Sequence, residues 1–347
     1  MMKHIRLLLL VLLFARCEEP IDLKFDNEPK DFLVVDGIIT TERKAHQITI
    51  SRATPFTNNE VTPFDKESVR EISISDDQGN RFPLFEVDKG VYLTHDDFAG
   101  IEGRCYQLEL RTINNETYRS TPQKIPVNGT INDARFEYEV EPIYNSSADQ
   151  FVDKEVLKVY ADYSFPANHD FIAFDWEGTF FLRVPGSFGR PRECYVADSN
   201  NGIEPVLSNV NRSNLSFENQ ELFSLTYDFR FRDRYSLNVR MFSISEEAFN
   251  FLSDVEKQLN TTGSIFDPAP KQIFSNIANV SNEDEVVLGF FGAFNVTEKR
   301  IFISRSEIPA GETFNICSRG GPGRPPDFCF DCTIYFGASA TKPPYWD

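Results

Sequence analysis

The sequence has little of what nucleic-acid-binding proteins and helical membrane proteins require. Its 35 lysine and arginine residues stand against 53 aspartate and glutamate residues, for a formal net charge of −18. Because nucleic acid is bound through a basic surface, this balance excludes it as the partner. The apolar run Leu7–Phe14 is far shorter than the roughly 20 residues that span a bilayer, and long apolar helical runs are absent from the rest.

The motifs of common enzymes are also missing. The four histidines form no His-Glu-x-x-His pair, and there is no Gly-x-Ser-x-Gly, no P-loop and no dinucleotide-binding glycine motif. A pair of carboxylates for glycoside cleavage carries no information here, because 53 acidic residues always include some pair. We therefore predict a protein that is not an enzyme and needs no cofactor.

The N-terminus has the form of a bacterial export signal. Lys3 and Arg6 precede the apolar run, and Cys17 follows it. We predict that residues 1–16 are a signal peptide and that Cys17 is the lipid anchor, with a plain secreted chain as the alternative. Residues 17–30 then form an acidic linker, and loss of three basic residues with the signal changes the formal charge from −18 to −21.

Beyond the linker, short aromatic and β-branched runs alternate with Asn, Asp, Gly and Pro, which is typical of an all-β chain. Strand-like runs with turn signals between them predict an immunoglobulin-like β-sandwich over residues 31–126. One turn contains Asp76, Asp77 and Asn80, whose oxygens could hold calcium. Their spacing fits no EF-hand, so we predict a hairpin turn.

A larger β domain is predicted over residues 127–316. Ile172, Phe174 and Trp176 alternate along one strand and indicate a core tryptophan rather than a sugar-stacking platform. The runs "EVVLGFFGAF" and "KRIFISRSEIP" are interpreted as a final strand pair with Asn295 in the turn between them.

One helix is predicted, over residues 245–262, and it should cover one face or end of the sheet. Ser243 and Glu246 have the spacing of a capping box. Apolar side chains then recur at helical spacing, at Phe249, Leu252, Val255 and Leu259.

The C-terminal segment, residues 317–347, is rich in cysteine, glycine and proline and cannot bury a core of its own. An exported chain favours disulfides over the alternative of a zinc site. We predict two bridges, of undetermined connectivity, with Cys105 as the odd thiol. The four candidates are Cys194, Cys317, Cys329 and Cys332.

The chain resembles the Bacteroidota outer-membrane lipoproteins catalogued as domain of unknown function 4249. The resemblance covers most of the mature sequence and rests on "VVDGIITTERKAHQITISRATPF", "YSLNVRMFSISEEAFNFLSDVEKQLNTTGSIFDPAP", "NIANVSNEDEVVLGFFGAF" and "CFDCTIYFGASATKPPYW". The chain departs from the pattern at Arg16, before the anchor cysteine, and in an extra proline near the end.

The resemblance implies an accessory lipoprotein that sits beside a TonB-dependent transporter, an outer-membrane β-barrel protein, as a binding or gating subunit. Glu18 and Glu19, directly after Cys17, resemble the surface-export signal of this phylum and imply that the protein faces the extracellular side. The alternatives are a structural subunit of an outer-membrane assembly or secretion complex, and a free-standing carbohydrate-binding module. With only 2 tryptophans the last is disfavoured.

Aromatic side chains of the C-terminal segment are a first guess for the surface that meets the barrel, because the segment lacks secondary structure of its own. They are Phe328, Phe330, Tyr335, Phe336, Tyr345 and Trp346.

Overall fold

The protein is mainly β, as predicted, with a single α-helix among the residues that the structure describes. The computed structural model describes residues 32–53, 64–145, 150–165, 171–186, 188, 190–199, 206–209, 216–259, 273–282, 284–309, 316–317 and 325–346. No helix in these ranges is both long and apolar enough to span a bilayer.

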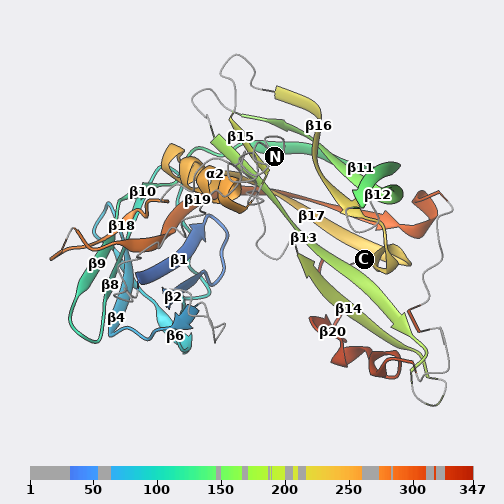
Figure 1. Ribbon diagram of the computed structural model, residues 1–347, viewed down its shortest axis with the longest axis horizontal. Helices are drawn as coiled ribbons and strands as arrows, with labels where there is room; N and C mark the ends of the chain where they lie inside the picture. The colour runs from blue at the N-terminus through green and yellow to red at the C-terminus, as the bar shows by residue number, and fades with distance from the viewer. Residues whose placement is uncertain are drawn as a thin grey trace, which may run out of the picture.

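An eleven-stranded sheet extends through both halves of the molecule. Its order is β20 (Ala338–Ser339), β14 (Arg192–Ser199), β13 (Phe171–Val184), β17 (Arg234–Ser243), β19 (Val287–Ser304), β1 (Phe32–Thr40), β2 (Gln47–Ala53), β7 (Val91–Leu93) and β6 (Phe85–Asp88). At its sides, β15 (Val206–Asn209) pairs with β13, and β3 (Phe64–Lys66) pairs with β2. Figure 1 shows β19 running from one half into the other.

The strand β19 corrects the prediction of a final strand pair. It is one continuous strand of 18 residues, and Asn295 lies inside it rather than in a turn. Its first half pairs in parallel with β1, up to Phe294 opposite Thr40, and its second half pairs antiparallel with β17 from Asn295 onward. Asn295 is a buried polar residue at the point where the strand changes partners. In the sequence, an asparagine between two apolar runs looks like a turn signal.

The N-terminal half is a β-sandwich. Its second sheet has the order β18 (Ile277–Asn279), β9 (Thr117–Ser120), β8 (Cys105–Arg111), β4 (Glu71–Asp76) and β5 (Arg81–Pro83), with β10 (Gln123–Lys124) beside β8. The core between the sheets includes Ile277, Val287 and Phe291. The unit predicted over residues 31–126 is therefore completed by strands far along the chain, and it shares a sheet with the other half.

The turn after β4 is held by Asp76. Its buried carboxylate accepts hydrogen bonds from the backbone N–H groups of Gln78 and Asn80 and from the Asn80 side chain, and it pairs with Arg104 at 2.7 Å. Burial alone would raise the pKa of this carboxyl, but these donors outweigh burial and lower it. The carboxylate oxygens are thus used by the hairpin itself, which fits the predicted turn.

The C-terminal half is a second sandwich, in which the large sheet packs against three strands. These are β11 (Thr130–Asn145), β12 (Gln150–Ser164) and β16 (Ser216–Thr226). Trp176 lies in the core between the two layers with Ile172 and Phe174, as predicted. Short 3-10 helices connect and end the strands: η2 (Phe229–Phe231), η3 (Arg305–Glu307), η4 (Asp327–Cys329) and η5 (Cys332–Ile334).

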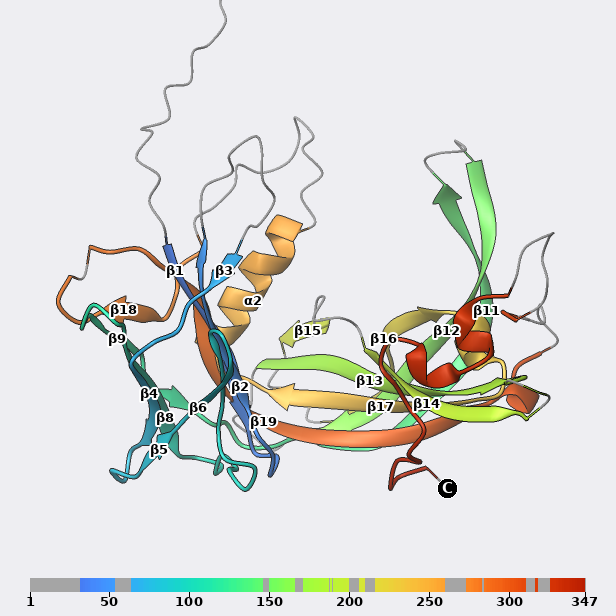
Figure 2. The ribbon, with the colours of Figure 1, turned by 90° about the horizontal axis from the view of Figure 1, so that it is seen from below.

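The hairpin of β11 and β12 projects beyond its sheet as an arm, which Figure 2 shows on the upper side of the molecule. β16 pairs with β12 only from Val156 onward. Among the described residues, 140–145 and 150–155 therefore pair with each other, apart from one hydrogen bond from the Tyr227 N–H to the Glu155 carbonyl. We call these two segments the arm. Pro142 lies in β11, the edge strand, where a missing N–H is tolerated.

Two disulfides tie the C-terminal segment to the second sandwich. Cys194 of β14 is bonded to Cys332 across 138 residues of sequence, and Cys317 is bonded to Cys329. The predicted four cysteines are therefore confirmed as two bridges, the zinc alternative is wrong, and Cys105 is the free thiol.

Candidate functional site

The candidate site is a groove where the two sandwiches meet, on the face of the large sheet that faces away from both cores. Its volume is about 570 Å³, and its wall includes residues of β1, β2, β13, β17 and the helix α2 (Glu246–Leu259). Because paired residues of adjacent strands point to the same side, the sheet register brings Asp175, Arg240 and Glu298 onto this face. We call it the junction groove.

The helix α2 forms one wall of the groove, and its start differs from the predicted capping box. Ser245, not Ser243, is the N-cap, and its hydroxyl accepts the N–H of Ala248 at 3.1 Å. Ser243 is the last residue of β17 and is buried. Glu246 and Glu247 occupy the first turn, where the helix dipole favours negative charge.

α2 is held on the sheet by aromatic packing. Phe251 stacks on Phe290 of β19 with ring centroids 4.8 Å apart, and Phe249 contacts Phe171 at 4.9 Å. Leu252 also packs into this cluster, whereas Leu259 is exposed. The helix therefore covers one face of the sheet, as predicted, and leaves the groove open beside it.

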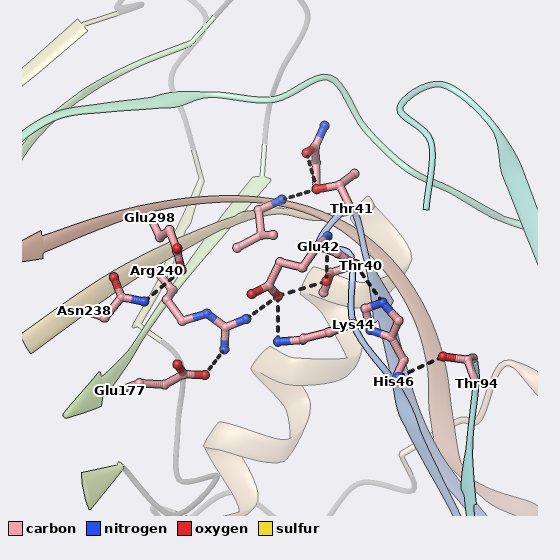
Figure 3. Close-up of polar contacts among 12 residues, drawn as sticks. Thr40, Thr41, Glu42, Lys44, His46, Thr94, Glu177, Asn238, Arg240 and Glu298 are labelled. Carbon is pink, nitrogen blue, oxygen red and sulfur yellow. Dashed lines mark hydrogen bonds and ion pairs between the residues drawn. The ribbon is translucent and has the colours of Figure 1, made fainter. Parts of the chain in front are cut away.

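Arg240 of β17 is the centre of an ion-pair network at the inner end of the groove (Figure 3). Its side chain is 9 % exposed, and its two Nη atoms bind Glu42 at 2.6 Å and Glu177 at 2.8 Å. Lys44 binds the same Glu42 oxygen at 2.8 Å. Glu42 follows β1 and Glu177 lies on β13, so this network joins the two halves of the molecule through charge-assisted hydrogen bonds.

Burial and charge set the ionisation of the residues around Arg240. Desolvation would raise the pKa of Glu42, but Lys44 and Arg240 outweigh it, and the pKa is lowered. Desolvation lowers the pKa of His46, which keeps its imidazole neutral. His46 Nε2 lies 3.2 Å from the backbone carbonyl of Glu42, and the backbone N–H of His46 donates to the Thr94 hydroxyl. This histidine therefore shapes the loop after β1.

Two other carboxylates, those of Asp36 and Asp175, line the groove, and their pKa values are raised rather than lowered. The side chain of Asp36 on β1 is open to solvent, yet desolvation by the surrounding groove walls raises the pKa of its carboxyl. Desolvation also raises the pKa of Asp175, despite its bond to the N–H of Trp176 and the nearby Arg240. Neither carboxylate forms an ion pair within the described ranges.

Behind the network, Asn295 connects the end of β1 to the first sandwich. Its amide oxygen accepts from Thr41 at 2.9 Å, and its Nδ2 donates to Glu102 at 2.9 Å and to the Pro126 carbonyl at 3.0 Å. All its hydrogen-bonding positions face other parts of the chain, so the crossing point of β19 is fully bonded.

The C-terminal aromatic residues do not share one surface. Trp346 is buried against Tyr195 and Phe302. The Tyr345 hydroxyl contacts Thr179 at 2.9 Å, and Phe328 contacts the ring of Tyr335 at 5.2 Å.

Phe330 is half-buried, whereas Phe336 is 96 % exposed. The segment is bound to the sheet through β20. Of the six residues that we guessed for an interface, Phe336 therefore presents most of its side chain to solvent.

The predicted anchor and its surroundings, Cys17 and the linker 17–30, lie outside the described residues. The same holds for residues 260–262 of the predicted helix. Within the described ranges, no group of three or more His, Cys, Asp or Glu side chains is arranged to hold a metal ion.

Sequence reasoning missed the groove and the arm. Arg240 stands in "LNVRMFS", where it alternates with the core residues Val239 and Met241 and therefore looks like an ordinary solvent-facing charge. The arm exposes Val140, Ile143, Tyr144, Phe151 and Val152 at its end, on both faces of the hairpin. In the sequence, these apolar residues look the same as core residues of a strand.

The geometry defines a class before a family: a mainly β protein of two fused sandwiches with a groove at their junction. A family model described as Domain of unknown function (DUF4249) matches residues 18–300. The match covers well over half of the chain, so the protein belongs to this family, as the resemblance indicated. It includes every residue of the junction groove and of the arm. A comparison with curated proteins found no match.

Proposed function

We propose that this protein is a lipid-anchored bacterial surface protein that serves as an accessory binding subunit of an outer-membrane TonB-dependent transporter, without catalysis. Cys17 would carry the acyl chains, and Glu18 and Glu19 would direct the protein to the outer surface. The family resemblance motivates the transporter as partner. In the groove, the main charges bind one another, which suits a surface that holds its shape rather than one that moves protons.

The observation that carries the proposal is the arm. Its end exposes an aromatic pair, Tyr144 and Phe151, whose rings meet at 5.5 Å, and Phe151 is 69 % exposed. Isolated exposed apolar residues are ordinary, but five along one projecting hairpin, on both of its faces, form the kind of surface that partners cover. Aromatic residues of this kind supply much of the binding energy of interfaces.

The position of the arm fits a tethered protein. β1 begins on the side of the molecule to which the arm points (Figure 2). A linker of residues 17–30 reaches at most about 50 Å when extended. The anchor therefore holds this side toward the membrane, where a barrel would present its loops.

The acidic surface limits where such a contact can form. With a mature formal charge of −21, counted without the signal peptide, most of the surface stays solvated or meets basic loops. A stable interface buries about 1,200–2,000 Å² in total. The arm would supply its apolar centre and the flanking acidic strands its polar rim.

Co-purification from outer membranes in mild detergent tests the proposal. The double variant Tyr144→Ser, Phe151→Ser should stay membrane-bound and folded but lose the barrel partner. Ile113→Ser, at a turn residue that is 63 % exposed in the first sandwich, is the matched control and should keep the partner. Retention of the barrel by the arm variant would show that the arm is not the contact.

The same preparation separates the other functions considered. A wild-type protein that elutes alone would overturn the accessory role and favour a free-standing module, whereas an assembly factor as partner would favour a structural subunit. Phe336→Ser tests the most exposed aromatic residue of the described part of the C-terminal segment. Cys17→Ala should release the protein from membranes, and an unmodified Cys17 in the intact mass would refute the lipid anchor.

A further inference from the structure

The charged side chains that line the junction groove fall into two groups. Its cations, Lys44 and Arg240, are already bound to the carboxylates of Glu42 and Glu177. Its two carboxylates, Asp36 and Asp175, have no cation bound among the described residues; Asp175 Oδ1 accepts only the N–H of Trp176, at 2.7 Å. Among the described residues, the groove therefore offers unpaired negative charge and no unpaired positive charge.

Asp175 is half-buried without a counterion, and Asp36, although open to solvent, is partly desolvated by the groove walls. Desolvation raises the pKa of Asp36 and of Asp175, which means that each site stabilises its charge less well than water does. A cation placed beside either carboxylate would remove this cost. Negative charge in a groove also raises the local concentration of cationic ligands.

Between the two carboxylates the groove is apolar. Ile38 of β1 is 40 % exposed, and the rings of Phe242 and Phe294, which also line the groove, meet at 6.2 Å. Leu252 of α2 forms the side wall. An apolar surface of this kind, rimmed by charge, favours a ligand with an apolar middle.

The pairing with β19 bounds the separation of the two carboxylates along the sheet. Asp36 is aligned with Phe290, and Asp175 is aligned through Arg240 with Glu298. At about 3.3 Å per residue, positions 290 and 298 are at most roughly 26 Å apart along β19, which curves between the two halves of the molecule (Figure 2). An extended peptide of about eight residues covers the same length.

We propose that the junction groove binds an extended segment of a partner polypeptide, with a basic side chain at each end and apolar side chains between. One basic group binds Asp36 and the other binds Asp175, while the apolar residues lie over Ile38, Phe242 and Phe294. The ion pairs of Arg240 hold the two carboxylate-bearing strands in position before the segment arrives.

Random blocked octapeptides on an array, probed with the purified protein, test the specificity. Bound peptides should be enriched in arginine or lysine near both ends and in aliphatic or aromatic residues between. Enrichment of acidic peptides, or no enrichment, would overturn the proposal. Replacing arginine by the uncharged citrulline in a selected peptide should weaken binding by about tenfold or more.

Calorimetry with that peptide then locates the site. Asp36→Asn and Asp175→Asn should each weaken binding by about tenfold, and added salt should weaken wild-type binding. Asp96→Asn removes an exposed carboxylate elsewhere and should change nothing. Equal binding by Asp36→Asn, Asp175→Asn and the wild type would place the peptide outside the groove and refute the assignment.

Two further measurements identify the source of the cation and separate this proposal from the proposed function. Putrescine and calcium should not displace the peptide at equal concentration; displacement by either would show that a small cation is the ligand. The arm variant Tyr144→Ser, Phe151→Ser should bind the peptide as the wild type does. Loss of barrel co-purification and loss of peptide binding are thus caused by different variants.

Discussion

The junction groove and the arm are two candidate binding surfaces that differ in their side chains and in how they are held in place. In the groove, charged side chains are positioned by one another, and the strands beneath them carry the cores of two sandwiches. In the arm, two strands pair mainly with each other, and their apolar side chains face solvent. The groove can therefore discriminate by charge and position, whereas the arm contributes apolar area.

This difference separates stability from binding. The ion pairs of Arg240 and the hydrogen bonds of Asn295 hold the two halves of the protein together, so their loss should cost folding free energy, whereas the loss of the unpaired Asp175 charge should not. Residues at the end of the arm contact little of their own chain, so changes there should affect partners alone. Four variants, taken from the largest expected effect on stability to the smallest, test the contrast.

Arg240→Met should have the largest effect, because it leaves Glu42 and Glu177 without their buried counter-charge. Removing one partner of a buried pair costs about 3–5 kcal/mol, and the partial exposure of both glutamates reduces this to about 2–3 kcal/mol. Denaturant unfolding measures it. Lys44→Met, at a more exposed cation of the same network, should cost less than about 1 kcal/mol; equal losses would show that Arg240 has no special role.

Asn295→Leu should cost about 2 kcal/mol. The substitution removes all three hydrogen bonds of the buried Asn295 amide, to Thr41, to Glu102 and to the Pro126 carbonyl. Asn132→Leu, at an exposed position of β11, is the control and should stay within about 0.5 kcal/mol of the wild type. A thermal unfolding midpoint unchanged in Asn295→Leu would contradict a structural role at the crossing of β19.

Asp175→Asn should stabilise the protein at neutral pH by on the order of 1 kcal/mol. The pKa of Asp175 is raised in the folded state, so folding is favoured when the carboxyl is protonated, and this contribution is lost as the pH rises through the folded pKa. The gain from asparagine should therefore be full at pH 7 and vanish as the pH falls toward 3.8, the ordinary pKa. A gain that is independent of pH would point to packing instead.

Tyr144→Ser with Phe151→Ser should have the smallest effect on stability, about 0.5 kcal/mol, because the ring pair is exposed. The same variant should lose its barrel partner. A large loss of stability would mean that the arm is part of the fold rather than a surface for partners, and the contrast with the groove would disappear.

Much of the fold could be predicted locally. Alternation in "FIAFDWEGTFFLRV" correctly indicated a strand with Trp176 inside, because a period of two places every second side chain in the core. The helix was predicted within a few residues because its apolar spacing is periodic, while its cap was placed at Ser243 instead of Ser245. Asn295 was misread as a turn because asparagine is common in turns, and the sequence does not show that this one is buried inside a strand.

The candidate site could not be predicted from local sequence patterns. Asp36, Asp175 and Arg240 stand on three different strands, and their proximity follows from the pairing of β19 with β1 on one edge and with β17 on the other. Nothing in a single strand specifies which distant strand lies beside it. The same reason explains why β18 and the first half of β19 were not assigned to the first sandwich.

The sequence by itself determined the mainly β character of the protein, its one described helix and the need for bridges among Cys194, Cys317, Cys329 and Cys332. Each of these depends on residue types and short spacings, which act locally. Only the tertiary structure decided which cysteines pair, that both sandwiches share a sheet, and that two unpaired carboxylates face a groove beside paired cations. Those features depend on which distant strands lie side by side, and that is set by the packing of the whole chain.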